Sequence, residues 1–302
     1  MTIKPSEALP LLEALINEKK LSIFAGSGIS VDSGLPAWDG FIDKYIEICE
    51  LLNNSLPDSL KFTEILSDAK SHCNANLIET ITALKDKVKY CQEKGADIGF
   101  FDDIINKLFY NANSNKYHEI IVSTDYQHII TTNYDSLLEL AANSLGYNEL
   151  LTRSYSYVDS KKLTAAIYSG KTALIHAHGK IADLKLDQFV LTKQDYLNIM
   201  KHNPGFRLII NTIFITNSVL FVGYGGSDPH FEDIIDDLNL TLNWDQNSDI
   251  LPKCYIMMRK DKITPIREHL NNSNRVDIIS FSEYSEMLDF LDKLRISHPR
   301  IK

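Results

Sequence analysis

The stretch that decides the fold is LSIFAGSGISVDSGLPAWDGF, residues 21–41. Its first five residues suit a buried strand, which runs into Gly26-Ser27-Gly28 and then into the expected start of a helix. Glycines at a strand end let backbone N–H groups approach an anion closely, and a helix N-terminus adds partial positive charge. The stretch therefore predicts a phosphate-binding turn. A tight turn that merely closes a βα unit is the alternative, because Val31 stands where the fingerprint G-x-G-x-x-G needs its third glycine.

Length and composition indicate a large globular chain and exclude several classes of protein. The 302 residues are 44% hydrophobic, which is enough for a sizeable core, and the net charge of −9 argues against direct binding of nucleic acid. Residues 1–20 lack the unbroken apolar run of an export signal, and the apolar window 208–223 is interrupted by polar residues. We therefore expect a cytoplasmic protein without a membrane span. The four cysteines include no C-x-x-C pair, so neither a zinc ribbon nor a disulfide framework is expected.

Short apolar strands are expected to alternate with helices along the chain. After the strand at 21–25, further strands are expected at 128–132, 172–176, 218–222, 254–258 and 276–281. Between the first two strands the apolar residues recur only with helical spacing. Continuously apolar strands that alternate with helices are typical of a parallel sheet buried on both faces. We expect an α/β, Rossmann-like sheet of six parallel strands, in one domain with its core at 1–41 and 121–302 and a helical insertion at 42–120.

Four of the expected strands end in polar or glycine-rich segments. The first ends in Gly-Ser-Gly, the second is followed by Asn133 and Asp135, the third by His178, and the fourth by Gly223-Tyr224-Gly225. Ligands of parallel sheets bind beyond the carboxyl ends of the strands, near the point where the strand order reverses. Four such segments at one edge are hard to attribute to turn chemistry alone.

These segments resemble the motifs of the sirtuin superfamily. The sirtuin opening G-A-G-x-S is matched by residues 26–30, its G-I-P by 34–36, its T-Q-N-x-D by 131–135 and its catalytic H-G by 178–179. Four motifs in the right order, each near the end of a strand, are much more specific than any one of them. The resemblance covers residues from about 21 to about 281.

Departures from the sirtuin pattern indicate which group of sirtuins the chain resembles. The zinc-binding cysteine tetrad of the protein deacylases is missing, and Trp38-Asp39 replaces the aromatic-arginine pair that follows G-I-P. The G-Y-x-x-S-D-P pattern of residues 223–229 and the pair Asp195-Tyr196 look like bacterial sirtuin-like effectors of anti-phage defence. That group includes the Thoeris effector and the sirtuin-like partner of the HerA translocase.

The resemblance implies NAD as the substrate, no metal, and a division of roles among the site residues. His178 would be the general base toward water or a ribose hydroxyl, and Asn133 would orient that water. The reaction implied is hydrolysis of NAD+ to nicotinamide and ADP-ribose, or a cyclic form of it, which depletes NAD in abortive infection. The residues expected to bind NAD are Gly26, Ser27, Gly28, Ser30, Pro36, Trp38, Thr132, Asp135, Gly223, Tyr224 and Gly225.

Each of these assignments has an alternative. His178 could be a strand-end histidine bonded to a carbonyl, Asn133 a turn residue, and Asp135 a helix N-cap. At the level of function, one rival is an NAD-dependent protein deacylase or ADP-ribosyltransferase. The other is a non-catalytic subunit that binds NAD or ADP-ribose.

Regulation is expected to come from outside this chain. Only one short helix follows Phe281, so control is expected from homo-oligomerisation or from a separate defence partner, with a HerA-type ATPase as the leading candidate. Residues 42–120 are expected to supply the assembly surface, with a lid over the site as the alternative.

Overall fold

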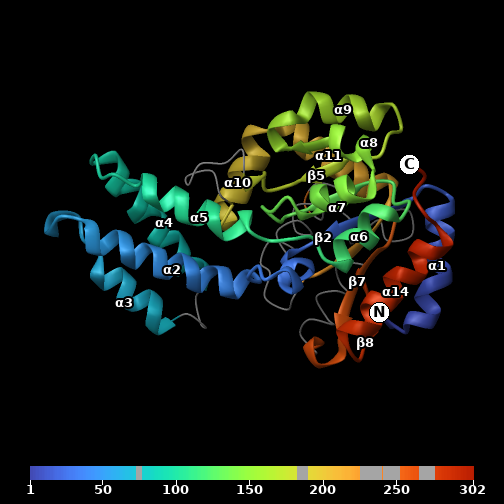
Figure 1. The fold of residues 1–302 in the computed structure, drawn as a ribbon, viewed down its shortest axis with the longest axis horizontal. Coiled ribbons are helices and arrows are strands. Elements are labelled where there is room, and N and C mark those ends of the chain that lie inside the picture. Colours follow the sequence, from blue (N-terminus) through green and yellow to red (C-terminus); the bar gives the residue numbers. More distant parts are fainter. Residues whose placement is uncertain (73–76, 182–189, 225–239, 241–251, 265–275) are drawn as a thin grey trace.

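The protein is built on a single parallel sheet (Figure 1). The computed structural model describes residues 1–72, 77–181, 190–224, 240, 252–264 and 276–302. These residues form eight parallel strands in the order β1-β8-β7-β6-β2-β3-β5-β4. The strands are β1 (Thr2–Ile3), β2 (Leu21–Ala25), β3 (Ile129–Thr131), β4 (Ser154–Ser156), β5 (Leu174–His176), β6 (Ser218–Val222), β7 (Cys254–Arg259) and β8 (Val276–Phe281).

The parallel α/β fold and all six expected strands are confirmed, but the count of six is too low. The two additional strands, β1 and β4, lie at the two edges of the sheet and have only two and three residues. Strands this short are added by pairing with a neighbour and leave no periodic signal in the sequence.

Helices cover both faces of the sheet, as expected. One face carries α1 (Pro5–Asn17), α6 (Lys116–Ser123), α7 (Leu137–Leu145), α8 (Asn148–Thr152) and α14 (Tyr284–Ser297), and the other carries α9 (Ser160–Tyr168), α10 (Lys193–His202) and α11 (Pro204–Thr216). Side chains of β2 alternate between the two faces, with Ile23 in the first core and Phe24 in the second. Phe24 stacks on Phe221 of β6 with 5.3 Å between ring centroids.

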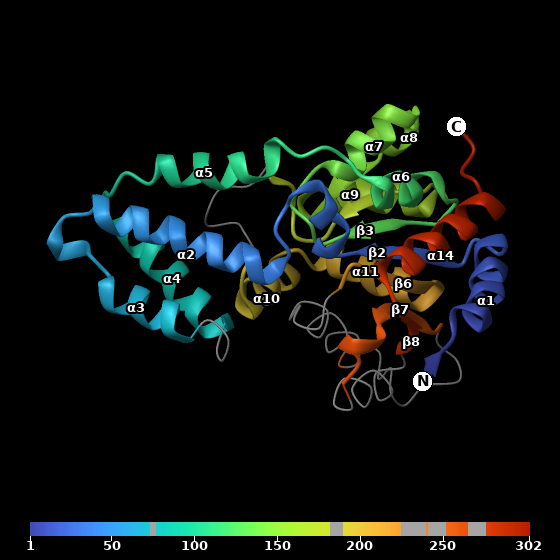
Figure 2. The same ribbon diagram turned by 60° about the horizontal axis from the view of Figure 1, so that its bottom comes forward.

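An arm of four helices extends away from the sheet (Figure 2). These helices are α2 (Trp38–Ser55), α3 (Thr63–His72), α4 (Leu77–Glu93) and α5 (Gly99–Tyr110). The arm has a hydrophobic core of its own, which Tyr134, Ile181 and Leu191 of the sheet domain join. A partly buried ion pair of 2.6 Å between Lys85 of α4 and Asp195 of α10 also connects the two parts. The division of the chain at residues 41/42 and 120/121 stays a prediction.

The topology places a site at the carboxyl ends of the central strands. Strand β2 lies between β3 and β6. From β2 the chain builds one half of the sheet through β3, and it returns to the other side of β2 only at β6. The strand order therefore reverses between β2 and β6, where parallel sheets bind their ligands. Within the described part of the chain, no helix is both long and apolar enough to cross a membrane.

Candidate functional site

Two adjoining cavities lie where the central strands end. The inner cavity, of about 50 Å³, lies among the loops after β2, β3 and β5 and is closed by Phe41 and Phe109 of the arm. The outer cavity, of about 340 Å³, lies between the loop after β2 and the ends of β6 and β7. Ser27 and Trp38 line both cavities, so the two form one site divided by these side chains.

The structure brings most of the predicted site residues to these cavities. Those that line the inner cavity are Ser27, Ser30, Pro36, Trp38, Thr132, Asn133, Asp135 and His178. Those that line the outer cavity are Ser27, Gly28, Trp38, Gly223 and Tyr224. Gly26 lies beneath them at the end of β2, and Gly225 lies outside the described residues. The roles of these residues in binding and catalysis stay predictions.

The glycines after β2 allow the backbone of this loop to lie very close to the backbone at the end of β6. A Cβ on Gly28 would lie 2.6 Å from the carbonyl oxygen of Gly223, and a Cβ on Gly26 would lie 3.0 Å from the same atom. The N–H groups of Gly26 and Gly28 donate to the carbonyl oxygens of Val222 and Gly223, at 2.8 and 2.9 Å. The expectation that these two amides are available to an anion is therefore wrong, because the loop after β6 already uses them.

The segment after these glycines is also shorter and tighter than expected. Residues Ser27–Ser33 form a 3₁₀ helix, which ends at Gly34 in the left-handed conformation with φ of 82°. The tighter winding carries Ser30 inward, where its side chain is buried. The helix predicted to start here is thus a short connector that aims one hydroxyl at the site.

Ser30 is the centre of a buried hydrogen-bond network. Its hydroxyl donates to Asp135 Oδ2 at 2.9 Å and accepts from Asn133 Nδ2 at 3.1 Å. His118 Nδ1 accepts the backbone N–H of Asn115 at 3.1 Å, so its Nε2 carries the proton and donates to Ser30 Oγ at 3.2 Å. Burial lowers the pKa of His118 to about 4, which keeps this ring neutral. All three hydrogen-bonding positions of the Ser30 hydroxyl are occupied.

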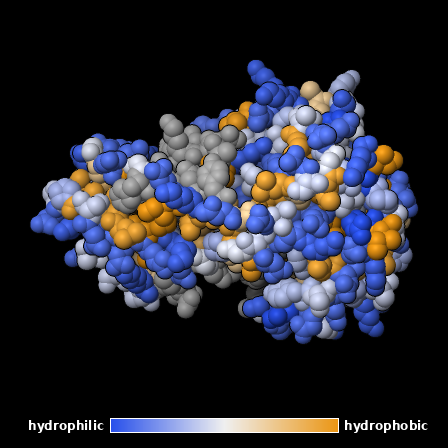
Figure 3. Space-filling view, viewed as in Figure 1, coloured by the Kyte–Doolittle hydropathy of each residue, from blue (hydrophilic) through white to orange (hydrophobic). Residues whose placement is uncertain are grey.

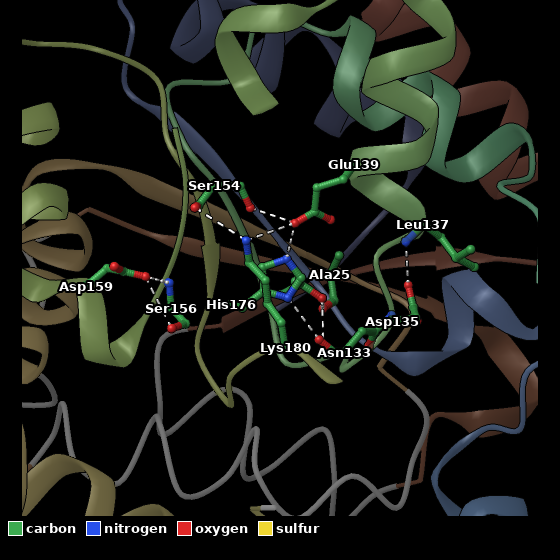
Figure 4. Close-up of polar contacts among 11 residues, drawn as sticks. Ala25, Asn133, Asp135, Leu137, Glu139, Ser154, Ser156, Asp159, His176 and Lys180 are labelled. Atoms are coloured by element: carbon green, nitrogen blue, oxygen red, sulfur yellow. Dashed lines mark hydrogen bonds and ion pairs between the residues drawn. The ribbon is translucent and has the colours of Figure 1, made fainter. Parts of the chain in front are cut away.

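Asn133 is held at three of its four polar groups. Its N–H donates to Thr131 Oγ1 at 3.0 Å, its backbone carbonyl accepts from His176 Nδ1 at 3.2 Å, and its Nδ2 donates to Ser30. Figure 4 shows the histidine contact. The remaining group, Oδ1, is buried and has no hydrogen-bond partner among the described residues. A buried acceptor without a partner is costly, so its presence in a cavity indicates a ligand or water that donates to it.

Asp135 is a carboxylate committed to the protein on both oxygens. Oδ1 accepts from the N–H of Leu137 at 3.1 Å, and Oδ2 accepts from Ser30. The N-cap alternative for Asp135 is wrong, because the N-cap residue of α7 is Ser136. Burial raises the pKa of Asp135, although these two hydrogen bonds and the charge of His176 oppose the rise. Asp135 therefore organises the loop after β3 in addition to lining the inner cavity.

His178 follows β5 and lines the same cavity as Asn133. Its ring is buried between Tyr134 and Tyr196, with 6.4 Å between ring centroids on each side. Thr132 Oγ1 and the hydroxyl of Tyr224 lie 3.0 Å apart and connect the loops after β3 and β6. The imidazole of His178 and the side chain of Asn133 thus line one small cavity.

Several residues of the site were not expected from the sequence. Phe109 of the arm and His118 of α6 carry no motif, since one reads as a core aromatic and the other as a helix residue. Two further residues that line the outer cavity are Arg259, the last residue of β7, and Lys262, three residues later, and no sequence pattern marked them. Within the described ranges, no group of three or more His, Cys, Asp or Glu side chains is arranged to hold a metal ion.

A doubly wound parallel sheet with a divided site at its switch point defines a Rossmann-like α/β protein. Residues 127–279 match the SIR2-like domain, and the chain belongs to this family.

Among its relatives, defense-associated sirtuin 2 of Bacillus subtilis is 28% identical over 233 residues, which are 74% of this chain and 19% of that protein. The NAD(+) hydrolase ThsA of Enterococcus faecium is 24% identical over 310 residues, covering 94% of this chain and 57% of that protein. ThsA of Cytobacillus dafuensis is 24% identical over 76% of this chain and 40% of its own length. The chain thus spans less than two thirds of the length of each of these relatives. A solved sirtuin structure aligns over 97% of both chains with 13% identity and a TM-score of 0.39.

Proposed function

We propose that this chain hydrolyses NAD+ to nicotinamide and ADP-ribose, and that it acts in anti-phage defence by depleting NAD. The observation that carries the proposal is the buried Oδ1 of Asn133, without a partner among the described residues, in the cavity that His178 also lines. An oriented acceptor and a base are what a protein needs to direct a water molecule at a sugar carbon. Two relatives of the chain carry the name NAD(+) hydrolase, which supports the same substrate.

The divided site suits a dinucleotide. In this proposal the nicotinamide riboside occupies the inner cavity, against the aromatic wall of Trp38 and Phe109, and the ADP half occupies the outer cavity. Lys262 and Arg259 line the outer cavity and offer positive charge to the pyrophosphate. Trp38, which lines both cavities, then contacts the substrate where its two halves join.

Hydrolysis of the glycosidic bond requires the protein mainly to position the substrate and the attacking water. The bond between C1′ of the ribose and the nicotinamide nitrogen breaks, and the electron pair leaves with nicotinamide, which becomes neutral. Water adds to the oxocarbenium-like C1′ and loses one proton, so the products are nicotinamide, ADP-ribose and H⁺. Asn133 Oδ1 accepts a hydrogen bond from the attacking water, and His178 takes its proton. The carboxylate of Asp135, which lines the same cavity, favours the positive charge that develops on the sugar.

The test is nicotinamide release from NAD+ by the purified chain, followed by chromatography that separates ADP-ribose from a cyclic product. We expect Asn133→Ala and His178→Ala each to lower the rate by about 100-fold or more. His202→Ala, which changes an exposed histidine on α10, is the matched control and keeps the wild-type rate. Calorimetric titration with NAD+ accompanies the assay. Binding without turnover supports a non-catalytic subunit, and absence of both binding and turnover refutes the proposal.

We further propose that the arm α2–α5 provides a surface for assembly, either with copies of the chain or with a defence partner such as a HerA-type ATPase. In Figure 3, apolar side chains gather over α2, α4 and α5. Leu51 of α2 is 54% exposed and Tyr90 of α4 is 43% exposed. Mass photometry of the wild type and of Leu51→Glu tests this proposal. A wild type that stays monomeric, alone and with the ATPase, contradicts it.

A further inference from the structure

A second polar cluster lies next to Asn133, and the proposed chemistry does not use it (Figure 4). Its centre is His176 on β5, whose side chain is fully buried. His176 Nε2 lies 2.9 Å from Glu139 Oε1 of α7, and the same oxygen accepts from Ser154 Oγ at 2.6 Å. Lys180 Nζ lies 3.4 Å from that oxygen. A buried ionic cluster this close to a reaction site needs an explanation.

Each ring nitrogen of His176 has a hydrogen-bond partner. Nδ1 faces the backbone carbonyl of Asn133, which can only accept, and Nε2 faces the carboxylate of Glu139, which also accepts when ionised. Burial raises the pKa of Glu139, but the charge and hydrogen bond of His176, the hydroxyl of Ser154 and the charge of Lys180 outweigh it and hold that pKa well below its usual range. Both ring nitrogens of His176 therefore face a hydrogen-bond acceptor, one on each side of the ring.

Charges on every side of His176 are accounted for in the described chain. Glu139 and Lys180 face it from α7 and from the segment after β5. Asp135 acts on it electrostatically from the loop after β3. On β4, Ser156 pairs with His176 in the sheet, and its N–H is bonded to Asp159 at 3.2 Å. Of these carboxylates, Glu139 is the one in direct contact with the ring.

We propose that His176, held in place by Glu139, is a positioning residue for Asn133 in the hydrolysis of NAD+, and this inference rests on the proposed function. The His176 bond fixes the peptide carbonyl of Asn133, while Thr131 and Ser30 fix its N–H and its amide nitrogen. Loss of the carbonyl bond frees that peptide to rotate. The rotation moves Oδ1, the atom that receives the water. A misplacement of about 1 Å at a reacting group costs about 100-fold in rate.

Two substitutions separate the two bonds of His176. The amide nitrogen of Asn takes the place of Nδ1, so His176→Asn keeps the bond to the Asn133 carbonyl and loses the bond to Glu139. The longer Gln places its amide nitrogen near Nε2, so His176→Gln keeps Glu139 and loses the carbonyl. We expect His176→Gln to lower kcat by about 10- to 100-fold with KM for NAD+ within about twofold, and His176→Asn to lower kcat by less than about fivefold.

Stability is expected to rank the two variants in the opposite order. His176→Asn leaves Glu139 with only Ser154 and Lys180, so it melts at a lower temperature than His176→Gln. A purely structural role predicts that kcat follows the melting temperature. Loss of activity in that order, or wild-type kcat in His176→Gln, overturns the proposal.

A nuclear magnetic resonance measurement separates this inference from the proposed function. In the full chain labelled with ¹⁵N-histidine, His176 is assigned by the signals that disappear in His176→Gln. We expect Nδ1 of His176, which faces the carbonyl oxygen of Asn133, to carry a proton at pH 7 in the wild type. If the wild type binds NAD+ but releases no nicotinamide, the proposed function fails while these signals still report the proton on Nδ1. An unprotonated Nδ1 in the wild type overturns the inference.

Discussion

Substitution of Gly28 by alanine tests the contact that joins the loops after β2 and β6. The new Cβ would lie 2.6 Å from the carbonyl oxygen of Gly223 and 2.9 Å from its Cα. Ordinary contact begins at 3.4 Å, so the loops must separate by about 0.8 Å. Gly28 does not have a positive φ, so alanine fits its backbone conformation and the steric contact alone is tested.

The magnitude follows from two losses. Forcing a methyl group into a packed interior costs about 1–3 kcal/mol, and stretching the hydrogen bond from Gly28 N–H to Gly223 removes about 1 kcal/mol more. For a domain of this size we expect the melting temperature to fall by about 5–10 °C. Ser27, which lines both cavities, moves with the loop, so we also expect kcat/KM for NAD+ to fall by about 100-fold.

The assay compares Gly28→Ala with Gly205→Ala by thermal unfolding and by nicotinamide release. A Cβ on Gly205, the second residue of α11, would lie 3.6 Å from Ser160 in ordinary contact. An alanine there stabilises the helix slightly and leaves turnover unchanged. If Gly28→Ala melts within about 1 °C of the wild type, the argument from backbone contact is refuted.

Three further perturbations test other parts of the structure. The pKa of His118 is lowered to about 4 from its ordinary 6.5, so the unfolded chain takes up the proton first as the pH falls, and the protein loses stability through this window. His118→Gln keeps a donor to Ser30 and should reduce that loss of stability by about 2–3 kcal/mol, measured by urea titration. The lowered pKa of Glu139 means that its contribution to stability is complete above pH 4.5 and is lost as the pH falls below that value. Glu139→Gln should therefore make the urea midpoint depend less on pH between pH 5 and 3, and an unchanged pH dependence contradicts the lowered pKa. Lys85→Met breaks the partly buried pair with Asp195 and should lower the free energy of unfolding by about 1–2 kcal/mol, measured by calorimetry. Lys44→Met, in an exposed pair, should lower it by only about 0–0.5 kcal/mol, and equal losses argue against a role for Lys85 in holding the arm.

Much of the sheet could be predicted because its central strands are continuous apolar runs. The bounds predicted for β2, β6 and β8 agree with the structure at both ends. Each of these strands is buried on both faces and is bounded by polar residues or glycine, which makes its limits visible. β1 and β4 were missed because an edge strand of two or three residues depends on the neighbour with which it pairs.

The site could be predicted in part for a topological reason. Parallel strands bring their carboxyl ends to one edge, so the segments containing Ser30, Asn133 and His178 had to meet there. The partners that hold these residues could not be predicted. His118 reaches Ser30 across 88 residues, and His176 reaches Asn133 through a backbone carbonyl, which no side-chain pattern records. The hydrogen bond of the Gly28 N–H likewise could not be predicted, because its acceptor, Gly223, comes close only in the folded chain.

Tyr134, in the loop after β3, connects the arm to the inner cavity. Asn133 and Asp135 both bond Ser30, whereas the ring of the tyrosine between them packs in the core of the arm, 6.2 Å from the ring of Phe109. Its hydroxyl donates to the carbonyl of Val190 at 2.7 Å. Residues 133–135 therefore contact both the inner cavity and the hydrophobic core of the arm. In the proposed hydrolysis, a partner that shifted α5 would move Tyr134 and with it the neighbouring Asn133, so the arm would act on turnover through the loop after β3 as well as through Trp38 and Phe109 in the inner cavity.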